Sequence, residues 1–91
     1  MPSTDYAVEF SAAADRQFGA LPRPVQTRVY ARAAALATDP RPSGCSKLAG
    51  EASTYRVRVG DYRIIYEVHD AEARILVLAI GAREHVYSRR R

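Results

Sequence analysis

The chain has 91 residues, of which 47% are apolar and 26% are charged, and its formal net charge is +4. This length fits one small domain with a single core, and this composition excludes an intrinsically disordered chain. The positive charge favours an anionic partner, but three of the charges are the C-terminal Arg89, Arg90 and Arg91. The inference of an anionic partner therefore depends on where the other arginines lie and not on the net charge.

Several kinds of protein are excluded by what the sequence lacks. Cys45 is the only cysteine, which excludes an intrachain disulfide and a cysteine metal site, and we interpret it as a bystander in a loop. The sequence has no signal-peptide pattern and no apolar run that approaches a membrane span, so we expect a cytoplasmic protein with no membrane contact. With two histidines and no clustered carboxylates, we expect neither a metal nor another cofactor.

The chain begins with a pattern typical of a strand followed by a short helix. Tyr6, Val8 and Phe10 alternate with other residues, which predicts a strand with one apolar face. Ser11 is a suitable cap for a helix over residues 12–19.

A second, longer helix is predicted after Pro22 and Pro24, because proline is well tolerated in a first turn. Its apolar residues recur at helical spacing on one face, namely Val25, Val29, Ala33 and Leu36. We expect the two helices to form a hairpin that lies across the apolar face of a sheet. Residues 39–46, DPRPSGCS, are rich in turn-forming residues and predict a connector.

Residues 55–68 predict a β-hairpin with a defined register. The loop 60–61, Gly-Asp, has glycine at its first position, which suits a type II′ turn. This turn places Val59 opposite Tyr62 and Arg58 opposite Arg63. Because side chains alternate between the faces of a sheet, one face is apolar and the other carries Arg56, Arg58 and Arg63.

The three arginines on one face allow two interpretations. Like charges directly opposite each other in a sheet are destabilising by ~0.2–1 kcal/mol, so a chain that only had to fold gains nothing from them. Three guanidinium groups form a site for an anion, and their geometry suits phosphate oxygens. The alternative is a solvated strand face whose charges are spread in water. The residues alone leave both interpretations open.

The last predicted elements are a turn at residues 70–73 and a strand at residues 74–80. This strand is apolar on both faces from Ile75 to Ile80, which predicts a position in the interior of the sheet. The predicted fold class is α+β in the order βααβββ, an antiparallel sheet with a two-helix hairpin packed on one face. We expect residues 1–91 to form a single domain.

The order of these elements and their motifs resemble the RelE/ParE superfamily of toxin–antitoxin toxins. The motifs are KLAG, YRVRVGDYRIIYEV, the final apolar strand and GAREHVY, and the most specific is the combination of GDYRIIYEV with the terminal G-x-R…VY. The resemblance implies the small microbial ribonuclease-like fold. RelE-type members cut messenger RNA in the ribosomal A site, where they orient the RNA so that its own 2′-hydroxyl attacks the adjacent phosphate.

Carried over residue by residue, the resemblance implies four catalytic candidates. Arg63 and Arg83 would clamp the phosphate and stabilise the transition state. Tyr87 would stack on a base or support proton transfer, and the alternative is that it packs the C-terminus against the sheet. His85 would act as an acid–base group, and the alternative is an ordinary surface histidine.

RNA binding is the role implied for Arg56, Arg58 and Lys47. Many RelE-type relatives carry lysine on the first strand of the meander, whereas this chain carries arginine. An arginine has a pKa above ~12 and cannot easily act as a general base, so Arg56 and Arg58 can bind and stabilise the RNA but the base is left open. We interpret His69 as structural or solvent-exposed and Glu67 as balancing charge on the arginine side.

Three functions remain open at this stage. The first is a ribosome-dependent endoribonuclease toxin that cleaves messenger RNA, blocks translation and is inhibited by a RelB-like antitoxin. The second is a ParE-like toxin that inhibits DNA gyrase without cutting RNA, and the third is a lapsed toxin that only binds its antitoxin. We expect an antitoxin that folds partly on binding, and both the helical-hairpin surface and the arginine side are docking areas for it.

Overall fold

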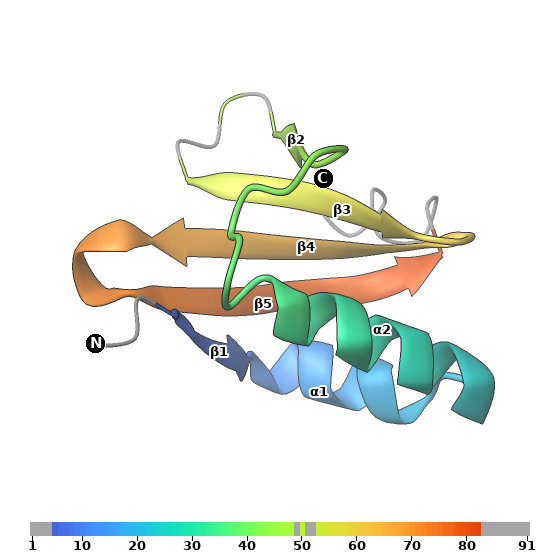
Figure 1. Ribbon diagram of the computed structural model, residues 1–91. Coiled ribbons are helices and arrows are strands. Elements are labelled where there is room, and N and C mark those ends of the chain that lie inside the picture. Colours follow the sequence, from blue (N-terminus) through green and yellow to red (C-terminus); the bar gives the residue numbers. More distant parts are fainter. Residues whose placement is uncertain (1–4, 49, 51–52, 83–91) are drawn as a thin grey trace.

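The computed structural model of the protein describes residues 5–48, 50 and 53–82. A five-stranded sheet has the order β1-β5-β4-β3-β2, with β1 parallel to β5 and all other neighbours antiparallel (Figure 1). Its strands are β1 (Ala7–Phe10), β2 (Ser46–Lys47), β3 (Thr54–Val59), β4 (Tyr62–His69) and β5 (Arg74–Ala82). The predicted α+β class is confirmed, and β5 lies in the interior of the sheet, between β1 and β4.

The predicted hairpin register is confirmed residue by residue. Val59 pairs with Tyr62 and Arg58 pairs with Arg63. Gly60 has a φ of 60°, and of the two loop residues it alone has a positive φ, as a type II′ turn requires. The short loop leaves the two strands no other way to pair, so local sequence was enough to fix the register of β3 and β4.

The two predicted helices are present as α1 (Ala12–Gly19) and α2 (Arg23–Ala35). The Ser11 hydroxyl caps α1 by accepting a hydrogen bond of 3.1 Å from the backbone N–H of Ala14. Pro22 is the N-cap residue of α2, and Pro24 lies in its first turn.

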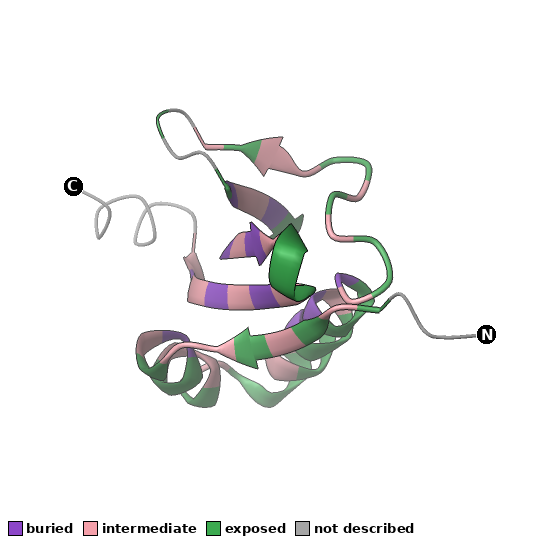
Figure 2. Cartoon of the chain, turned by 90° about the vertical axis from the view of Figure 1, so that its left-hand side faces the viewer, coloured by how far each residue is buried: buried purple, intermediate pink, exposed green. Residues whose placement is uncertain are grey.

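The core lies between the helices and one face of the sheet. Figure 2 shows that buried residues gather on the strands and on the helix surfaces turned toward them. The buried cluster combines helix residues with alternate strand residues: Ala14, Val29, Ala33, Leu36, Val57, Val59, Ile64, Tyr66, Val68, Ile75, Val77 and Ile80. We call the sheet face covered by α1 and α2 the helix face. Burial of this apolar surface is the main driving force of the fold.

Two features differ from the predicted arrangement. First, the sheet is mixed rather than antiparallel, because β1 pairs with a strand that is distant in sequence. Second, residues 46 and 47 form the short edge strand β2 although their surroundings are typical of a turn. The parallel pairing of β1 with β5 joins residues that are distant in sequence, which local patterns cannot predict. The turn predicted at residues 70–73 is confirmed: residues 70–72 form a 3₁₀ turn, η1 (Asp70–Glu72), which ends at Ala73 with a positive φ of 52°.

Candidate functional site

The three arginines of the hairpin lie on the sheet face opposite the helix face. Val57 and Ile64 form a pair within the helix-side core, and the pair next to them is Arg58 and Arg63. Alternation along β3 places Arg56 on the same side as Arg58, across from Ile65 of β4. We call the face that carries Arg56, Arg58 and Arg63 the arginine face. The structure thus brings these three candidates together, as predicted.

On the arginine face, charged side chains lie next to a buried apolar side chain. Arg63 is only 7% exposed, whereas Arg58 is exposed to solvent. Ile65 lies between Arg56 and the strand β5, and it has no exposed surface although it is not part of the helix-side core. A charge near apolar, water-excluded surroundings interacts more strongly with an oppositely charged group than the same charge in water. An anion bound beside Arg63 would be held more tightly for this reason.

Lys47 is not brought together with the three arginines. In β2 it pairs with Tyr55, and directly opposite residues of an antiparallel pair project on the same side of the sheet. Tyr55 packs against the helix-side core, so the exposed Lys47 belongs to that side at the edge of the sheet. The other three candidates, Arg83, His85 and Tyr87, lie outside the described residues.

A histidine–carboxylate pair lies at the far end of the arginine face. The Nε2 atom of His69 is 2.9 Å from an Oε atom of Glu67, and both side chains are about one-third exposed, at 36% and 32%. His69 is six positions after Arg63 in β4, which corresponds to about 20 Å along a strand. The pair is therefore too distant from Arg63 to act on the same phosphate.

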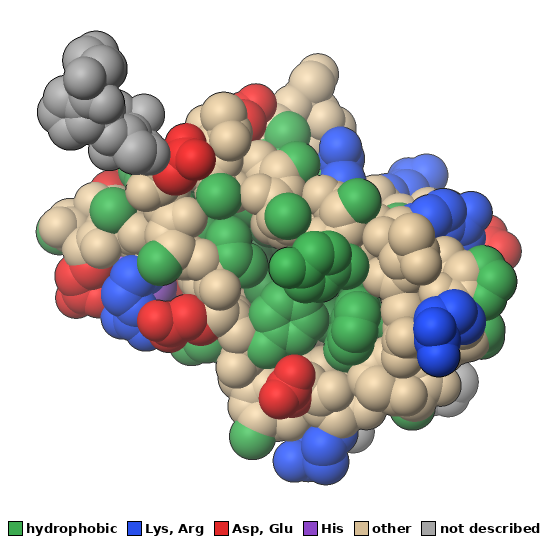
Figure 3. Space-filling model, turned by 60° about the horizontal axis from the view of Figure 1, so that its bottom comes forward, with side chains coloured by type: hydrophobic (Ala, Val, Ile, Leu, Met, Phe, Trp, Pro, Cys, Tyr) green, Lys and Arg blue, Asp and Glu red, His purple; other side chains and the backbone are tan. Residues whose placement is uncertain are grey.

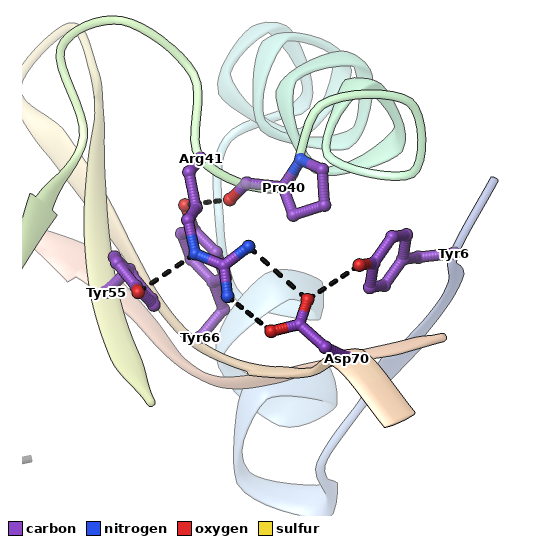
Figure 4. Close-up of polar contacts among 6 residues, drawn as sticks. All are labelled: Tyr6, Pro40, Arg41, Tyr55, Tyr66 and Asp70. Atoms are coloured by element: carbon purple, nitrogen blue, oxygen red, sulfur yellow. Dashed lines mark hydrogen bonds and ion pairs between the residues drawn. The ribbon is translucent and has the colours of Figure 1, made fainter. Parts of the chain in front are cut away.

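A polar network on the helix side ties four segments together (Figure 4). Asp70 accepts hydrogen bonds from Tyr6, at 2.6 Å, and from Nη2 of Arg41, at 2.7 Å. The guanidinium of Arg41 also donates to the hydroxyl of Tyr55 and lies 5.3 Å from the centre of its ring. Hydrogen bonding by Arg41, and secondarily by Tyr6, lowers the pKa of Asp70 below its ordinary value of 3.8. Sequence analysis missed this network because Arg41 lies in a stretch typical of turns.

The network fixes the connector between α2 and β2. The hydroxyl of Tyr66 donates a 2.8 Å hydrogen bond to the carbonyl of Pro40, and burial raises the pKa of this hydroxyl. The Tyr55 and Tyr66 rings are stacked with their centres 5.9 Å apart. The connector crosses the helix face from α2 to β2 (Figure 1). These aromatic and polar contacts therefore support the strands that carry Arg56, Arg58 and Arg63.

In the described part of the chain, no group of three or more histidine, cysteine, aspartate or glutamate side chains is arranged to hold a metal ion. Neither α1 nor α2 has the length and apolar character that crossing a membrane requires.

Comparisons with solved structures find toxins of the RelE type. The chain is 28% identical to part of the toxin–antitoxin complex RelBE2 from Mycobacterium tuberculosis, with a TM-score of 0.78 over 87% of this chain and 92% of that one. It is also 28% identical to a chain of the archaeal RelE–RelB complex from Pyrococcus horikoshii, with a TM-score of 0.77 over 87% and 96%. A mutant of the Escherichia coli toxin RelE in the free state matches at 25% identity and a TM-score of 0.79, over 92% of each chain.

Comparison with family models gives one match over most of the chain. Residues 8–87 match the model of the ParE toxin of the type II toxin–antitoxin system parDE. No curated protein sequence matches. The matched residues extend from β1 through the arginine-bearing hairpin and beyond β5. The chain therefore belongs to the ParE toxin family, within the RelE/ParE superfamily of toxins from type II toxin–antitoxin systems.

Proposed function

We propose that this toxin is a ribosome-dependent endoribonuclease that cleaves messenger RNA and so blocks translation. The observation that carries the proposal is the pairing of Arg58 directly opposite Arg63, with Arg56 on the same face of the sheet. This placement of like charges disfavours folding and favours an anionic ligand. Guanidinium groups bind phosphate oxygens through paired N–H donors, so the phosphates of RNA are a suitable ligand for this face.

The reaction we propose is attack of an RNA 2′-hydroxyl on the adjacent phosphate, with departure of the 5′ oxygen. It needs a group that removes the 2′ proton, a group that stabilises the negative charge of the transition state and a group that protonates the leaving oxygen. Arg63 and Arg83 stabilise the charge in this proposal, while Arg56 and Arg58 bind the RNA backbone. His85 and Tyr87 are the proposed groups for proton transfer and base stacking.

The partner we propose besides messenger RNA and the ribosome is a cognate, RelB-like antitoxin. This proposal is supported by the relatives at 28% identity, whose structures are complexes of RelE-type toxins with their antitoxins. We also propose that the protein acts in the cytoplasm, where ribosomes and messenger RNA are available, and that residues 1–91 form one toxin domain.

A second candidate function is inhibition of DNA gyrase without RNA cleavage. The observation that favours it is the family model, which describes a ParE toxin. The absence of lysine from β3 also favours it, because Arg56 and Arg58 do not readily exchange protons. The two candidates differ in their target, so an experiment in cells separates them.

The experiment is a brief induction of the protein in cells, followed by mapping of messenger RNA ends within coding regions. An Arg63→Ala/Arg83→Ala double variant is the comparison, and Arg16→Ala, an exposed arginine of α1, is the matched control. Cuts in translated messages that disappear in the double variant, persist in the control and stop when translation is blocked are the expected result. Intact messages with arrested DNA replication would identify a gyrase inhibitor. Intact messages with normal growth would identify a lapsed toxin.

A further inference from the structure

One side of helix α2 carries two arginines, Arg28 and Arg32, and lies toward the β3–β4 turn. The two residues are four positions apart in the helix, so their side chains lie on the same side of it. A Cβ atom placed on Gly60 would be 3.4 Å from Nη2 and 3.9 Å from Cζ of Arg28. The guanidinium of Arg28 therefore lies against the hairpin tip, by which we mean Gly60 and Asp61.

The charge of this side of α2 is not balanced within the described part of the chain. Arg28 is exposed, and its side chain forms no ion pair or hydrogen bond with any other described residue. Arg32 is partly buried, and its enclosed Nε atom has no hydrogen-bond partner among those residues. Like charges four positions apart destabilise a helix. As with the pair Arg58 and Arg63, this arrangement favours an anionic ligand over folding alone.

The hairpin tip brings Arg28 close to the arginine face. Arg58 is two residues before Gly60, which corresponds to about 7 Å along β3. Its side chain lies on the arginine face, whereas α2 packs on the helix face. Gly60 has no side chain and is exposed, so the path around the tip from Arg58 to Arg28 is short.

The distribution of charge over the surface agrees with this placement. Figure 3 views the helix side and shows several Lys and Arg side chains on the right, where Figure 1 places the hairpin tip and the beginning of α2. Most of the acidic side chains in this view lie elsewhere. Asp61 is an exposed carboxylate of the tip itself, and it would repel a phosphate. A phosphate at the tip is therefore expected on the side of Gly60 and Arg28.

The positions of the two arginines indicate what kind of anion binds. Arg28 and Arg58 lie on opposite sides of the sheet, so they do not converge on one small anion. They suit different phosphates of one strand that passes around the tip. Proteins bind single-stranded nucleic acid in this way, with positive charges that follow the backbone of the strand.

We propose that Arg28 binds a phosphate of the same RNA strand that the arginine face holds, beyond the phosphate that is cleaved. The strand leaves the arginine face past Gly60 and reaches the helix side at α2, where Arg32 adds positive charge. The inference rests on the proposed function and gives the path of its substrate. Arg28 is a binding residue in this proposal, so its loss should lower affinity for RNA and leave the chemical step unchanged.

The test measures the Kd of the full-length toxin for stalled ribosomes that carry either a short or a long message. The short message ends with the codon in the A site, and the long message continues beyond it. Both have a deoxyribose at the cleavage position, which removes the attacking 2′-hydroxyl, so binding is measured without cleavage. Because the preceding codon is paired with a transfer RNA, the strand is free only beyond the A-site codon.

Three variants are compared with the parent chain. Arg28→Gln removes the charge and keeps a polar side chain that suits a helix, and Arg28→Lys retains the charge. Arg16→Gln removes an equal charge from the exposed surface of α1 and is the matched control. Circular dichroism checks that each variant is folded.

We expect Arg28→Gln to raise the Kd for the long message about 10-fold, as the loss of one hydrogen bond to a charged group does. Arg28→Lys and Arg16→Gln should stay within about 3-fold of the parent, and all variants should do so with the short message. Loss of one phosphate contact should also reduce the slope of log Kd against log salt concentration by about 0.7. With a cleavable long message and saturating toxin, the single-turnover cleavage rate of Arg28→Gln should equal that of the parent.

Equal Kd values of the parent and Arg28→Gln for the long message would overturn the inference and leave the proposed function intact. An equal loss with both messages would also overturn it, because the anion at Arg28 would then belong to the RNA of the ribosome. A parent toxin that binds ribosomes with neither message would contradict the proposed function, and the inference would fail with it.

Discussion

Arg58 of β3 lies directly opposite Arg63 of β4. Only the pair Val59 and Tyr62 lies between these two arginines and the tight turn. The Cβ atoms of directly opposite residues are only ~4.5–5.5 Å apart, so the side chains of Arg58 and Arg63 leave the backbone close to each other. The turn at Gly60 prevents the strands from slipping to a register that would separate them. The fold therefore keeps two like charges next to each other, and an anion bound between the two arginines would reduce the repulsion between them.

This repulsion predicts that Arg58→Thr makes the protein more stable and less active. Threonine suits an exposed strand position, and removal of one like charge should raise the free energy of unfolding by ~0.2–1 kcal/mol. If the protein cleaves RNA as proposed, cleavage should fall, because one of the proposed phosphate-binding groups is lost. Urea denaturation and a cleavage assay measure the two effects on the same preparation.

Lys47→Thr is the control for that stability gain. Lys47 is also an exposed basic residue on a strand, but the residue opposite it is Tyr55 rather than a second cation. Lys47→Thr should therefore show no comparable gain in the free energy of unfolding. Salt provides a second check, since ~1 M salt shortens the screening length to about 3 Å and should shrink the advantage of Arg58→Thr. An advantage that grows with salt would rule out repulsion as its cause.

The turn itself predicts a destabilising effect of Gly60→Ala. Gly60 has a φ of 60°, a conformation that costs a residue with a Cβ atom roughly 1–2 kcal/mol. The new Cβ atom would be 3.4 Å from Nη2 of Arg28, which is an ordinary contact, so the backbone is the main cause of the loss. Gly19→Ala is the matched control, because Gly19 ends α1 without a positive φ and a Cβ atom there meets nothing within 4 Å. Thermal unfolding should show opposite shifts for the two variants.

The contrast between Arg63 and Lys47 explains what the sequence could predict. The face on which Arg63 lies follows from a two-residue loop only one residue away, so local chemistry was sufficient. The face of Lys47 depends on how β2 pairs with β3 after a connector that crosses the sheet. That path is fixed by contacts such as Arg41 with Asp70, whose residues are 29 positions apart. Sequence patterns within a short window cannot reveal such contacts. The roles of Arg83, His85 and Tyr87, which lie outside the described residues, stay predictions.

The network around Asp70 predicts a pH-dependent contribution to stability. The pKa of Asp70 is lowered in the folded protein by hydrogen bonds from Arg41 and Tyr6, so the ionised carboxylate favours the folded state. This contribution is fully present above the ordinary pKa of 3.8 and is lost as the pH falls through the lowered value. Asp70→Asn should therefore lower Tm at about pH 7 and have little effect at about pH 2.

The control for Asp70→Asn is Asp61→Asn in the β3–β4 turn. The carboxylate of Asp61 forms no ion pair within the described ranges, and its side chain is exposed. At about pH 7, its replacement should lower Tm by less than Asp70→Asn does. If Asp70→Asn shows the same Tm difference at both pH values, the ion pair with Arg41 does not account for the stability of the connector.

The two histidines of the chain should contribute very differently to RNA cleavage. His69 is paired with Glu67 at one end of β4, and the ~20 Å that six strand residues span is far beyond hydrogen-bond reach of a phosphate held by Arg63. We therefore expect His69→Asn to leave the cleavage rate within about 3-fold of the parent, whereas His85→Asn should lower it by ~10²–10⁴-fold, the usual contribution of an acid–base group. Single-turnover cleavage of messenger RNA on stalled ribosomes measures both rates without interference from product release. A large loss with His69→Asn and none with His85→Asn would place proton transfer at the Glu67 end of the sheet and would require the RNA to run along β4 rather than across the hairpin.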